Sequence, residues 1–349
     1  MTKDSRLLAL ATAVPPHELR QAEVMERSRL LFQTSPNQIE RLLPVYENAG
    51  IGRRFSCVPI EWYLAQHGWG ERTDLFIAGS VALLTDATQR CLEQAGLGIE
   101  EIDAVVSVST TGIATPSLDA RLMELLPFRR DLQRLPVFGL GCAGGVTGLS
   151  RAAALARATP GSKVLLLVVE LCGLTFRAQD LSKSNIIATA LFGDGAAALL
   201  ISTEGTGPRI SDWGEYTWPR SLDVMGWDVK EDGLGVLFSR DIPTLVRQEL
   251  REATDRFLAR RNLDRLDLAG YVCHPGGAKV LDALEDAFEL PRGALIHARA
   301  TLRDYGNMSA VTVLFVLKRL LASEPRAGRY LMSALGPGFT ASFAMLETL

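Results

Sequence analysis

The sequence predicts a layered α/β fold made of two related halves. Two observations carry this prediction. Short apolar runs alternate with longer segments of helical periodicity, and a similar order of elements returns in the second half of the chain. Alternation of this kind is typical of helices packed against a sheet whose strands are largely buried.

Each element of the first half has its own signal. Apolar residues recur at helical spacing in two segments, whereas four short, nearly continuous apolar runs indicate buried strands. In chain order, we expect a helix at residues 80–95, strands at 104–110 (AVVSVST) and 136–140 (PVFGL), a helix at 143–158, and strands at 163–170 (KVLLLVVE) and 195–202 (GAAALLIS).

The second half repeats parts of this order. Residues 263–272 (LDRLDLAGYV) resemble residues 97–106 (LGIEEIDAVV) in their leucine, acidic and apolar sequence. Residues 329–335 and 340–346 form a strand–turn–strand pair, which echoes the last two strands of the first half. The turn-rich residues 203–208 predict the break, so we expect halves at residues 1–205 and 206–349. Two unrelated α/β halves could give the same pattern.

Composition excludes several classes of protein. The 349 residues are 47% apolar and 22% charged with a net charge of -3, which is typical of a soluble globular enzyme and does not favour nucleic-acid binding. The longest apolar stretches are far shorter than about 18 residues, so no membrane span is expected, and the N-terminus lacks the pattern of a signal peptide. Five cysteines without a CxxC pair favour a reducing cytoplasm, and the four scattered histidines predict no metal site.

Cys142 is the first candidate for a catalytic residue. An apolar strand runs into the glycine-rich segment 141–145 (GCAGG), and a helical pattern follows. Free N–H groups and the dipole at a helix N-terminus stabilise a thiolate, and the same N–H groups can bind an oxyanion when that thiolate attacks a thioester. The alternative is that Cys142 is a small buried hydrophobic residue.

His274 and Asn307 are candidate partners of this cysteine. His274 ends an apolar run and precedes Pro-Gly-Gly, and Asn307 precedes an apolar helical pattern. Either could be structural, as a packed histidine or as a helix N-cap. We expect all three residues at strand-to-helix junctions, where ligands bind in open α/β sheets. A condensing enzyme needs a nucleophile, a proton acceptor and donors that stabilise an enolate.

At these residues the chain resembles the type III polyketide synthases, the chalcone synthase-like family of the thiolase superfamily. The resemblance extends over nearly the whole chain from about Leu7. It is carried by residues 141–145 (GCAGG), 192–198 (FGDGAAA), 274–277 (HPGG), 305–309 (YGNMS) and 336–338 (GPG). It implies a thiolase-like layered αβαβα fold from two duplicated halves. It also implies a homodimer, in which residues 115–116 reach toward the partner subunit.

The resemblance also implies the roles of the three candidates. Cys142 accepts the starter acyl group from coenzyme A and holds the growing chain, and His274 keeps the cysteine as a thiolate. His274 and Asn307 polarise the thioester of malonyl-CoA so that loss of CO2 gives a stabilised enolate. The substrates are acyl-CoA and malonyl-CoA, and no metal or other cofactor is required.

The resemblance assigns further residues to the substrate cavity. Phe192 matches the aromatic gatekeeper between the coenzyme A tunnel and the cavity, although it could be a core aromatic. Val236 replaces a second gatekeeper phenylalanine, Cys172 replaces a threonine, and Leu335 replaces an aromatic. The other cavity residues are Thr110, Thr111, Trp227, Ser309, Gly336, Pro337 and Gly338. Because burial of each CH2 contributes roughly 0.8 kcal/mol, an apolar lining favours an alkyl starter over a phenolic one.

Coenzyme A itself is expected near Arg53 and Arg54, although these could be a solvated pair of cations. From the bacterial branch that the chain resembles, we expect a medium- or long-chain fatty acyl-CoA starter and an alkylpyrone or alkylresorcinol product. The alternatives are a chalcone or stilbene-type synthase with an aromatic starter, and a ketoacyl-acyl carrier protein synthase III-like enzyme. A non-catalytic thiolase-like scaffold and a cysteine hydrolase are the remaining alternatives.

Overall fold

The structure is a computed structural model that describes residues 4–32, 40, 42–239 and 241–348. Its strands are β1 (Ser5–Ala13), β2 (His17–Arg20), β3 (Arg53–Ser56), β4 (Ala104–Ser109), β5 (Gln133–Phe138), β6 (Val164–Leu171), β7 (Asp194–Ser202), β8 (Arg209–Thr217), β9 (Met225–Lys230), β10 (Gly233–Phe238), β11 (Leu268–Cys273), β12 (Gly328–Gly336) and β13 (Thr340–Thr348). Its helices are α1 (Gln21–Leu31), α3 (Pro44–Glu47), α4 (Trp69–Ala95), α5 (Leu118–Leu125), α6 (Gly144–Ala158), α7 (Lys183–Leu191), α8 (Ile242–Leu245), α9 (Arg251–Ala259), α10 (Ala278–Ala287), α11 (Ile296–Tyr305) and α12 (Thr312–Ala322).

The sheet topology repeats once along the chain. In the described residues, nine strands follow the order β11-β12-β13-β8-β1-β7-β6-β4-β5. In the first half, β7 lies antiparallel between β1 and β6, and β6 pairs parallel with β4. In the second half, β13 lies antiparallel between β8 and β12, and β12 pairs parallel with β11. The same order and directions therefore occur twice, which confirms the prediction of two duplicated halves.

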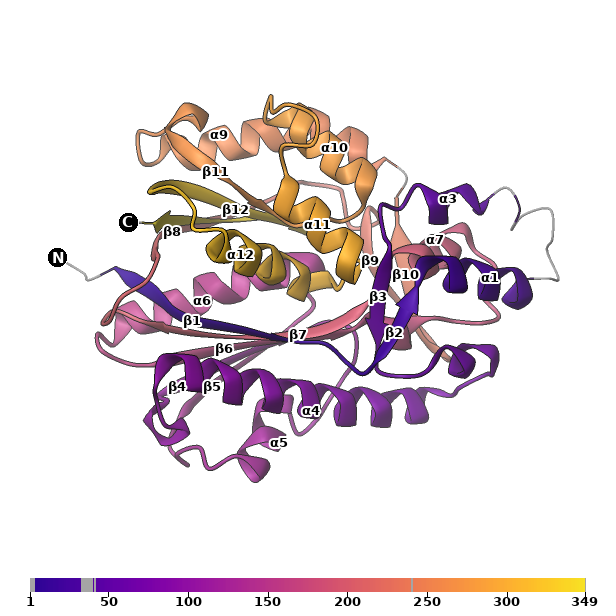
Figure 1. The fold of residues 1–349 in the computed structure, drawn as a ribbon, viewed down its shortest axis with the longest axis horizontal. Helices are drawn as coiled ribbons and strands as arrows, with labels where there is room; N and C mark the ends of the chain where they lie inside the picture. Colours follow the sequence, from indigo (N-terminus) through magenta and orange to yellow (C-terminus); the bar gives the residue numbers. More distant parts are fainter. Residues whose placement is uncertain (1–3, 33–39, 41, 240, 349) are drawn as a thin grey trace.

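The two halves stack into five layers. Figure 1 shows α9 and α10 above the strands of the second half, α6 and α12 in the middle, and α4 and α5 below the strands of the first half. Among the described residues, the sheets of the two halves join where Ser5 and Arg6 of β1 pair with Ile210 and Arg209 of β8. The predicted break at residues 203–208 falls in the loop between β7 and β8. The expected αβαβα layering is confirmed.

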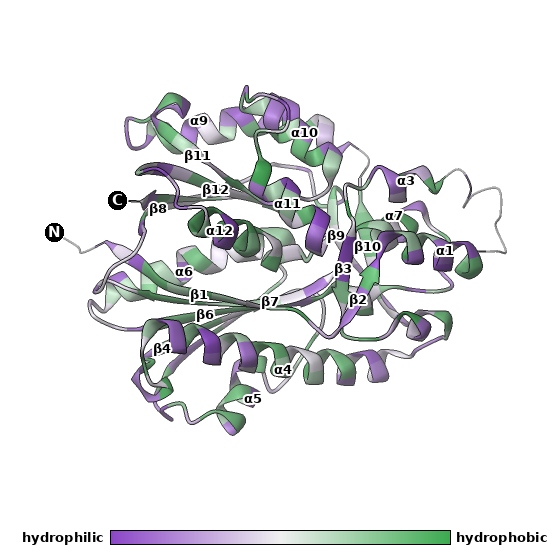
Figure 2. Cartoon of the chain, viewed as in Figure 1, coloured by the Kyte–Doolittle hydropathy of each residue, from purple (hydrophilic) through white to green (hydrophobic). Residues whose placement is uncertain are grey.

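The middle layer is buried on all sides, because a sheet covers each of its faces. α6 and α12 are apolar around most of their circumference, as expected of helices without a solvent face. Glycine lets them approach: a Cβ on Gly145 would lie 2.2 Å from the carbonyl oxygen of Ala310. Figure 2 shows hydrophobic residues along the strands, whereas hydrophobic and hydrophilic residues alternate along the outer helix α4.

Element boundaries follow the sequence prediction closely, with one large difference. The four expected strands correspond to β4, β5, β6 and β7, and residues 143–158 correspond to α6. Helix α4 begins at Trp69 instead of residue 80, because its first turns are only partly buried and lack a regular apolar period. In the part of the chain that the structure describes, no helix has the length and hydrophobicity needed to span a bilayer.

Candidate active site

Cys142 lies in a tight turn between a strand and a buried helix. After β5 the chain enters a 3-10 turn, Gly141–Ala143, which runs directly into α6. Gly141 has a φ of 48°, and a Cβ on it would lie 2.5 Å from Cδ of Pro337. Only glycine satisfies both conditions. The turn therefore holds Cys142, 9% exposed, at the amino end of α6, as predicted.

His274 follows β11 and precedes α10. Its backbone N–H donates to the carbonyl oxygen of Ser333 on β12 at 2.8 Å, which fixes the end of the strand. The ring is buried, and neither of its nitrogens has a hydrogen-bond partner among the described residues. Buried polar groups without partners are uncommon and call for an explanation such as a catalytic role. The imidazole is thus available to accept a proton or to bind a substrate.

Asn307 lies in a short link between α11 and α12. The prediction of a strand-to-helix junction is wrong here, since the link joins two helices and makes a single parallel bridge with Phe192. The Asn307 N–H donates to the carbonyl oxygen of Leu191 at 2.8 Å. Its Oδ1 accepts from the N–H of Ser309 at 2.9 Å, and its Nδ2 donates to the carbonyl oxygen of Gly276 at 3.3 Å. The side chain thus has a capping role as well as a place in the site.

These three residues line one cavity, which we call the Cys142 cavity. Its other lining residues are mostly apolar: Met225, Phe238, Ile242, Leu250, Gly276, Val280, Leu284, Ser333, Ala334 and Leu335. The structure thus brings together a thiol, an imidazole and a carboxamide from three distant segments. An apolar wall with a few convergent polar groups is typical of a small-molecule site.

Burial favours the neutral forms of the thiol and the imidazole. Burial raises the pKa of Cys142 to about 12, although hydrogen bonds to Ser309 and Asn307 lower it. Burial lowers the pKa of His274 to about 3. The helix N-terminus alone therefore does not give the thiolate expected from the sequence. A thiolate can form here by proton transfer to His274, which creates two opposite charges that stabilise each other.

Glu170 is a buried polar residue to which the sequence analysis gave no role. Its Oε2 accepts from the N–H groups of Thr110 and Thr111, both at 3.0 Å, and from Oγ1 of Thr111 at 2.8 Å. Its Oε1 has no partner among the described residues. Burial raises the pKa of this carboxyl to about 7, although the hydrogen bonds from Thr110 and Thr111 lower it. In the sequence, an acidic residue within the apolar run of β6 could have indicated a functional residue here.

A second cavity adjoins the first and contains most of the predicted substrate residues. This Trp227 cavity is lined by Gly141, Cys142, Cys172, Phe192, Met225, Gly226, Trp227, Val236, Leu237, Phe238, Ser309 and Pro337. Phe192 and Trp227 meet edge to face, with ring centroids 6.3 Å apart. Val236 lies opposite Trp227 in the β9–β10 pair. Cys142 belongs to both cavities.

The remaining predicted cavity residues do not belong to the lining of the Trp227 cavity but contact residues next to it. They are Thr110, Thr111, Gly336 and Gly338. Oγ1 of Thr110 accepts from the N–H of Gly141 at 3.0 Å, so both Thr110 and Thr111 bond within the protein. Gly336 and Gly338 shape the turn between β12 and β13. A Cβ on Gly336 would clash with a backbone oxygen, and Gly338 has a φ of 67°. That turn places Pro337 against Gly141.

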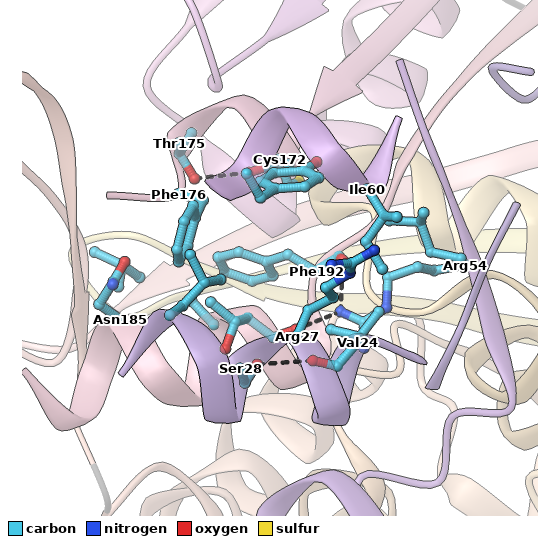
Figure 3. Close-up of a pocket in the computed structure, with 17 residues that line it drawn as sticks. Val24, Arg27, Ser28, Arg54, Ile60, Cys172, Thr175, Phe176, Asn185 and Phe192 are labelled. Carbon is cyan, nitrogen blue, oxygen red and sulfur yellow. Dashed lines mark hydrogen bonds between the residues drawn. The ribbon is translucent and has the colours of Figure 1, made fainter. Parts of the chain in front are cut away.

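A third cavity lies between α1 and α7, and we call it the α1–α7 pocket. It is lined by Leu19, Val24, Arg27, Ser28, Leu31, Arg54, Ile60, Tyr63, Cys172, Gly173, Thr175, Phe176, Asn185, Ala188, Thr189, Phe192 and Val236. Figure 3 shows Cys172 and Thr175 on one side of it and Val24 and Ser28 of α1 on the other. It shares Cys172, Phe192 and Val236 with the Trp227 cavity, so the three cavities form a series.

The two arginines predicted to contact coenzyme A differ in their surroundings. Arg53 is exposed and pairs with Glu18 at 3.0 Å. Arg54 is buried, and its guanidinium donates to backbone carbonyl oxygens at the end of α7. Neighbouring residues of a strand point to opposite faces, which explains the difference. Arg54 therefore has no surface position from which to bind a phosphate, contrary to the expectation. The contact of Arg53 with coenzyme A stays a prediction.

Comparison with known proteins assigns the family. Residues 62–205 match the family model described as "Chalcone and stilbene synthases, N-terminal domain", and residues 215–348 match the C-terminal domain of the same family. The chain belongs to the chalcone and stilbene synthase family. As in other type III polyketide synthases, its activity is acyl transfer that forms carbon–carbon bonds with malonyl-CoA. The resemblance stated from the sequence is confirmed.

Individual relatives are bacterial and align over nearly their full length. A "Putative chalcone synthase" of Bacillus subtilis (strain 168) is 39% identical, and the alignment covers 98% of each chain. A 1,3,6,8-tetrahydroxynaphthalene synthase of Streptomyces peucetius subsp. caesius is 37% identical over 99% of this chain and 93% of its own. The crystal structure of 1,3,6,8-tetrahydroxynaphthalene synthase from Streptomyces coelicolor A3(2) superposes with a TM-score of 0.94 at 31% identity, covering 98% of this chain and 99% of the other.

Proposed function

We propose that this type III polyketide synthase uses a medium- or long-chain fatty acyl-CoA as starter, extends it with malonyl-CoA and cyclises the product to an alkylpyrone or alkylresorcinol. The observation that carries the proposal is the α1–α7 pocket, which adjoins the Trp227 cavity at Cys172, Phe192 and Val236. An acyl group bound to Cys142 could extend its tail past these three residues into an apolar space.

The composition of the pocket wall favours an alkyl chain over a phenol. Two hydroxyl groups of the wall are engaged within the protein: Oγ of Ser28 donates to the carbonyl oxygen of Val24, and Oγ1 of Thr175 donates to that of Cys172. The Asn185 amide donates to two further backbone carbonyl oxygens. A buried phenolic hydroxyl would have to displace one of these bonds, whereas each buried CH2 contributes about 0.8 kcal/mol.

The catalytic roles that we propose for Cys142, His274 and Asn307 are supported by the shared position of these residues in one cavity. The Cys142 thiol transfers its proton to His274 and attacks the starter thioester, the bond to coenzyme A breaks, and the leaving coenzyme A thiolate takes that proton back from His274. His274 and Asn307 then donate to the carbonyl oxygen of malonyl-CoA. Loss of CO2 leaves the electron pair of the broken C–C bond as an enolate, which attacks the acyl-Cys142 carbonyl carbon and releases the thiolate. Two donors at the enolate oxygen supply the charge stabilisation, so we propose that no cofactor takes part.

A panel of starters tests this proposal. Purified protein is incubated with malonyl-CoA and octanoyl-, lauroyl-, palmitoyl- or 4-coumaroyl-CoA, and the products are identified by mass. We expect alkylpyrone or alkylresorcinol masses from the alkyl starters. Efficient use of 4-coumaroyl-CoA with none of the alkyl starters would contradict the proposal. So would an aromatic product formed from malonyl-CoA alone at the same rate with and without a starter.

We also propose a homodimer that pairs through the edge of the sheet at β5. Within the part of the chain that the structure describes, this strand pairs on one side only, with β4. It exposes Leu135 and Phe138, the latter 56% exposed, next to a surface depression that includes Thr115. Exposed apolar residues at an open strand edge are typical of an interaction surface. A cytoplasmic location stays a prediction from the cysteine usage.

A further inference from the structure

Arg54 lies where the segments that carry Phe192 and Asn307 meet. It is buried on β3, and its guanidinium is directed at the C-terminal end of α7. Nη1 donates to the carbonyl oxygens of Thr189 at 2.7 Å and Phe192 at 2.9 Å, and Nη2 donates to that of Ala190 at 2.9 Å. One side chain thus binds three backbone oxygens within four residues.

These oxygens belong to the part of a helix that lacks partners of its own. The last carbonyl groups of a helix have no intrahelical donor, and they form the negative end of its dipole, so a buried cation is stabilising there. Gln21 of α1 completes the arrangement. It accepts a hydrogen bond from Nη2 of Arg54, and its own amide donates to the carbonyl oxygens of Ala190 and Tyr46 at 3.1 and 3.0 Å.

The same end of α7 holds the backbone of Asn307. The Asn307 N–H donates to the carbonyl oxygen of Leu191, and the Gly193 N–H donates to the carbonyl oxygen of Asn307 at 3.0 Å. A Cβ on Gly193 or on Gly306 would lie 3.2 or 3.4 Å from the Cβ of Arg54. The Cβ of Arg54 therefore packs against Gly193, next to Phe192, and against Gly306, next to Asn307. Its guanidinium is hydrogen-bonded to the first of these two segments.

We propose that Arg54 is a positioning residue, which sets the place of the Asn307 carboxamide by anchoring the end of α7 to which Asn307 is hydrogen-bonded. Its side chain also lines the α1–α7 pocket, but its Nη1 and Nη2 atoms donate to backbone carbonyl oxygens and to Gln21, so its hydrogen bonds act on the position of Asn307. Lysine cannot replace it, since a single ammonium cannot reach three oxygens that a planar fork of donors binds together. The inference rests on the role proposed for Asn307 in decarboxylation.

A double-mutant cycle between Arg54→Lys and Asn307→Ala tests this inference. The readout is acetyl-CoA formation from malonyl-CoA by the purified full chain, which needs no knowledge of the starter. We expect Arg54→Lys to lower kcat at least tenfold in the wild-type background, because a displacement of about 1 Å costs up to about 100-fold. In the Asn307→Ala background, the same change should lower kcat less than twofold. Alkylation of Cys142 by iodoacetamide should be unchanged, which a general loss of structure would not allow.

Arg72→Lys is the matched control. Arg72 also donates to backbone carbonyl oxygens, those of His67, Leu174 and Phe176, but among the described residues no hydrogen bond links these to Asn307. Its effect on kcat should be the same in both backgrounds. An equal loss of kcat from Arg54→Lys in both backgrounds would overturn the inference.

A second variant is used if Arg54→Lys does not fold. Gln21→Met removes one hydrogen bond to the carbonyl oxygen of Ala190. It should lower kcat by a smaller factor than Arg54→Lys, and again only when Asn307 is present. Full activity of Asn307→Ala itself would instead overturn the proposed role of Asn307.

Discussion

At the scale of the residue, burial changes the pKa values of the two groups that we propose exchange a proton. Cys142 and His274 are each shifted toward the neutral form, by a raised thiol pKa and a lowered imidazole pKa. The neutral imidazole is therefore present at any pH above about 4, and it can take the thiol proton without first losing one of its own. Reactivity then depends on the pair and not on the pKa of either group alone.

The first prediction concerns this pair. His274→Gln removes the proton acceptor, so the Cys142 thiol keeps its raised pKa and alkylation by iodoacetamide at neutral pH should slow at least tenfold. The rate should then rise about tenfold for each unit of pH up to the alkaline limit of stability. Mass mapping of the labelled Cys142 peptide measures it, with the wild-type protein labelled in parallel as the reference. A rate at neutral pH equal to that of the wild type would show that His274 does not activate the thiol.

The second prediction concerns Glu170. Its pKa is raised to about 7 in the folded state from 4.5, so the folded protein holds this proton more tightly than the unfolded chain. The contribution of this group to stability is therefore greatest at low pH and falls as the pH rises from about 4.5 to about 7. The Glu170→Gln protein has no titrating carboxyl at this position, so its stability does not fall with pH for this reason. We expect the free energy of unfolding of the variant, relative to wild type, to increase by about 2 kcal/mol between pH 5 and pH 7.5.

Urea unfolding at the two pH values measures this difference. Asp194 and His274 also have shifted pKa values, but they are present in both proteins and cancel in the comparison. A difference between variant and wild type that does not change with pH would contradict the prediction.

At the scale of the element, α7 connects the α1–α7 pocket to the proposed catalytic residue Asn307. One face of this helix lines the α1–α7 pocket with Asn185, Ala188 and Thr189. Its end carries Phe192 and is hydrogen-bonded to Asn307. The hairpin of β9 and β10 supplies Trp227 and Val236 from the other side, where they border the Trp227 cavity. Few elements therefore determine the shape of the space available to the acyl chain.

A substitution on α7 tests the starter pocket. Ala188→Phe places a ring in the α1–α7 pocket, so kcat/KM for palmitoyl-CoA should fall at least 100-fold while that for a short starter such as butyryl-CoA changes less than threefold. Ala259→Phe, on the exposed end of α9, is the matched control and should change neither value. Steady-state kinetics with the two starters measures the ratio. An equal loss with both starters would place the acyl tail elsewhere.

At the scale of the whole molecule, duplication places the reacting groups in separate halves. Cys142 comes from the first half, His274 and Asn307 come from the second, and α6 and α12 lie together between the sheets. The catalytic cavity therefore exists only when both halves are folded and packed. Loss of either half should abolish the site, and not merely weaken it.

The proposed dimer gives the prediction at this scale. Phe138→Asp puts a charge on the exposed edge of β5, where burial of an unpaired carboxylate would cost several kcal/mol. Light scattering after size-exclusion chromatography should show a dimer for the wild type and a monomer for the variant. Leu266→Asp, in the 3-10 turn Arg265–Asp267, changes a residue that is 94% exposed and far along the chain from β5, and it should leave the dimer intact. A wild-type protein that is monomeric at micromolar concentration would contradict the proposal.

The sequence by itself determined the layered α/β class, the duplication and the three candidate residues. Periodicity and glycine placement are local properties, and the turn at Gly141 needs glycine whatever the rest of the chain does. Local pattern was insufficient at Asn307, which follows a helix and not a strand, because its pairing partner lies at Phe192, far along the chain.

Only the tertiary structure decided how these residues are charged and which of them face a cavity. Desolvation depends on every atom packed around a group, so no motif could show that burial opposes the Cys142 thiolate or leaves Glu170 with a free oxygen. The two adjacent arginines make the same point. Arg53 and Arg54 are alike in sequence, but β3 turns one to solvent and the other to the carbonyl oxygens of α7. Which side of a strand is buried is settled by what packs against it.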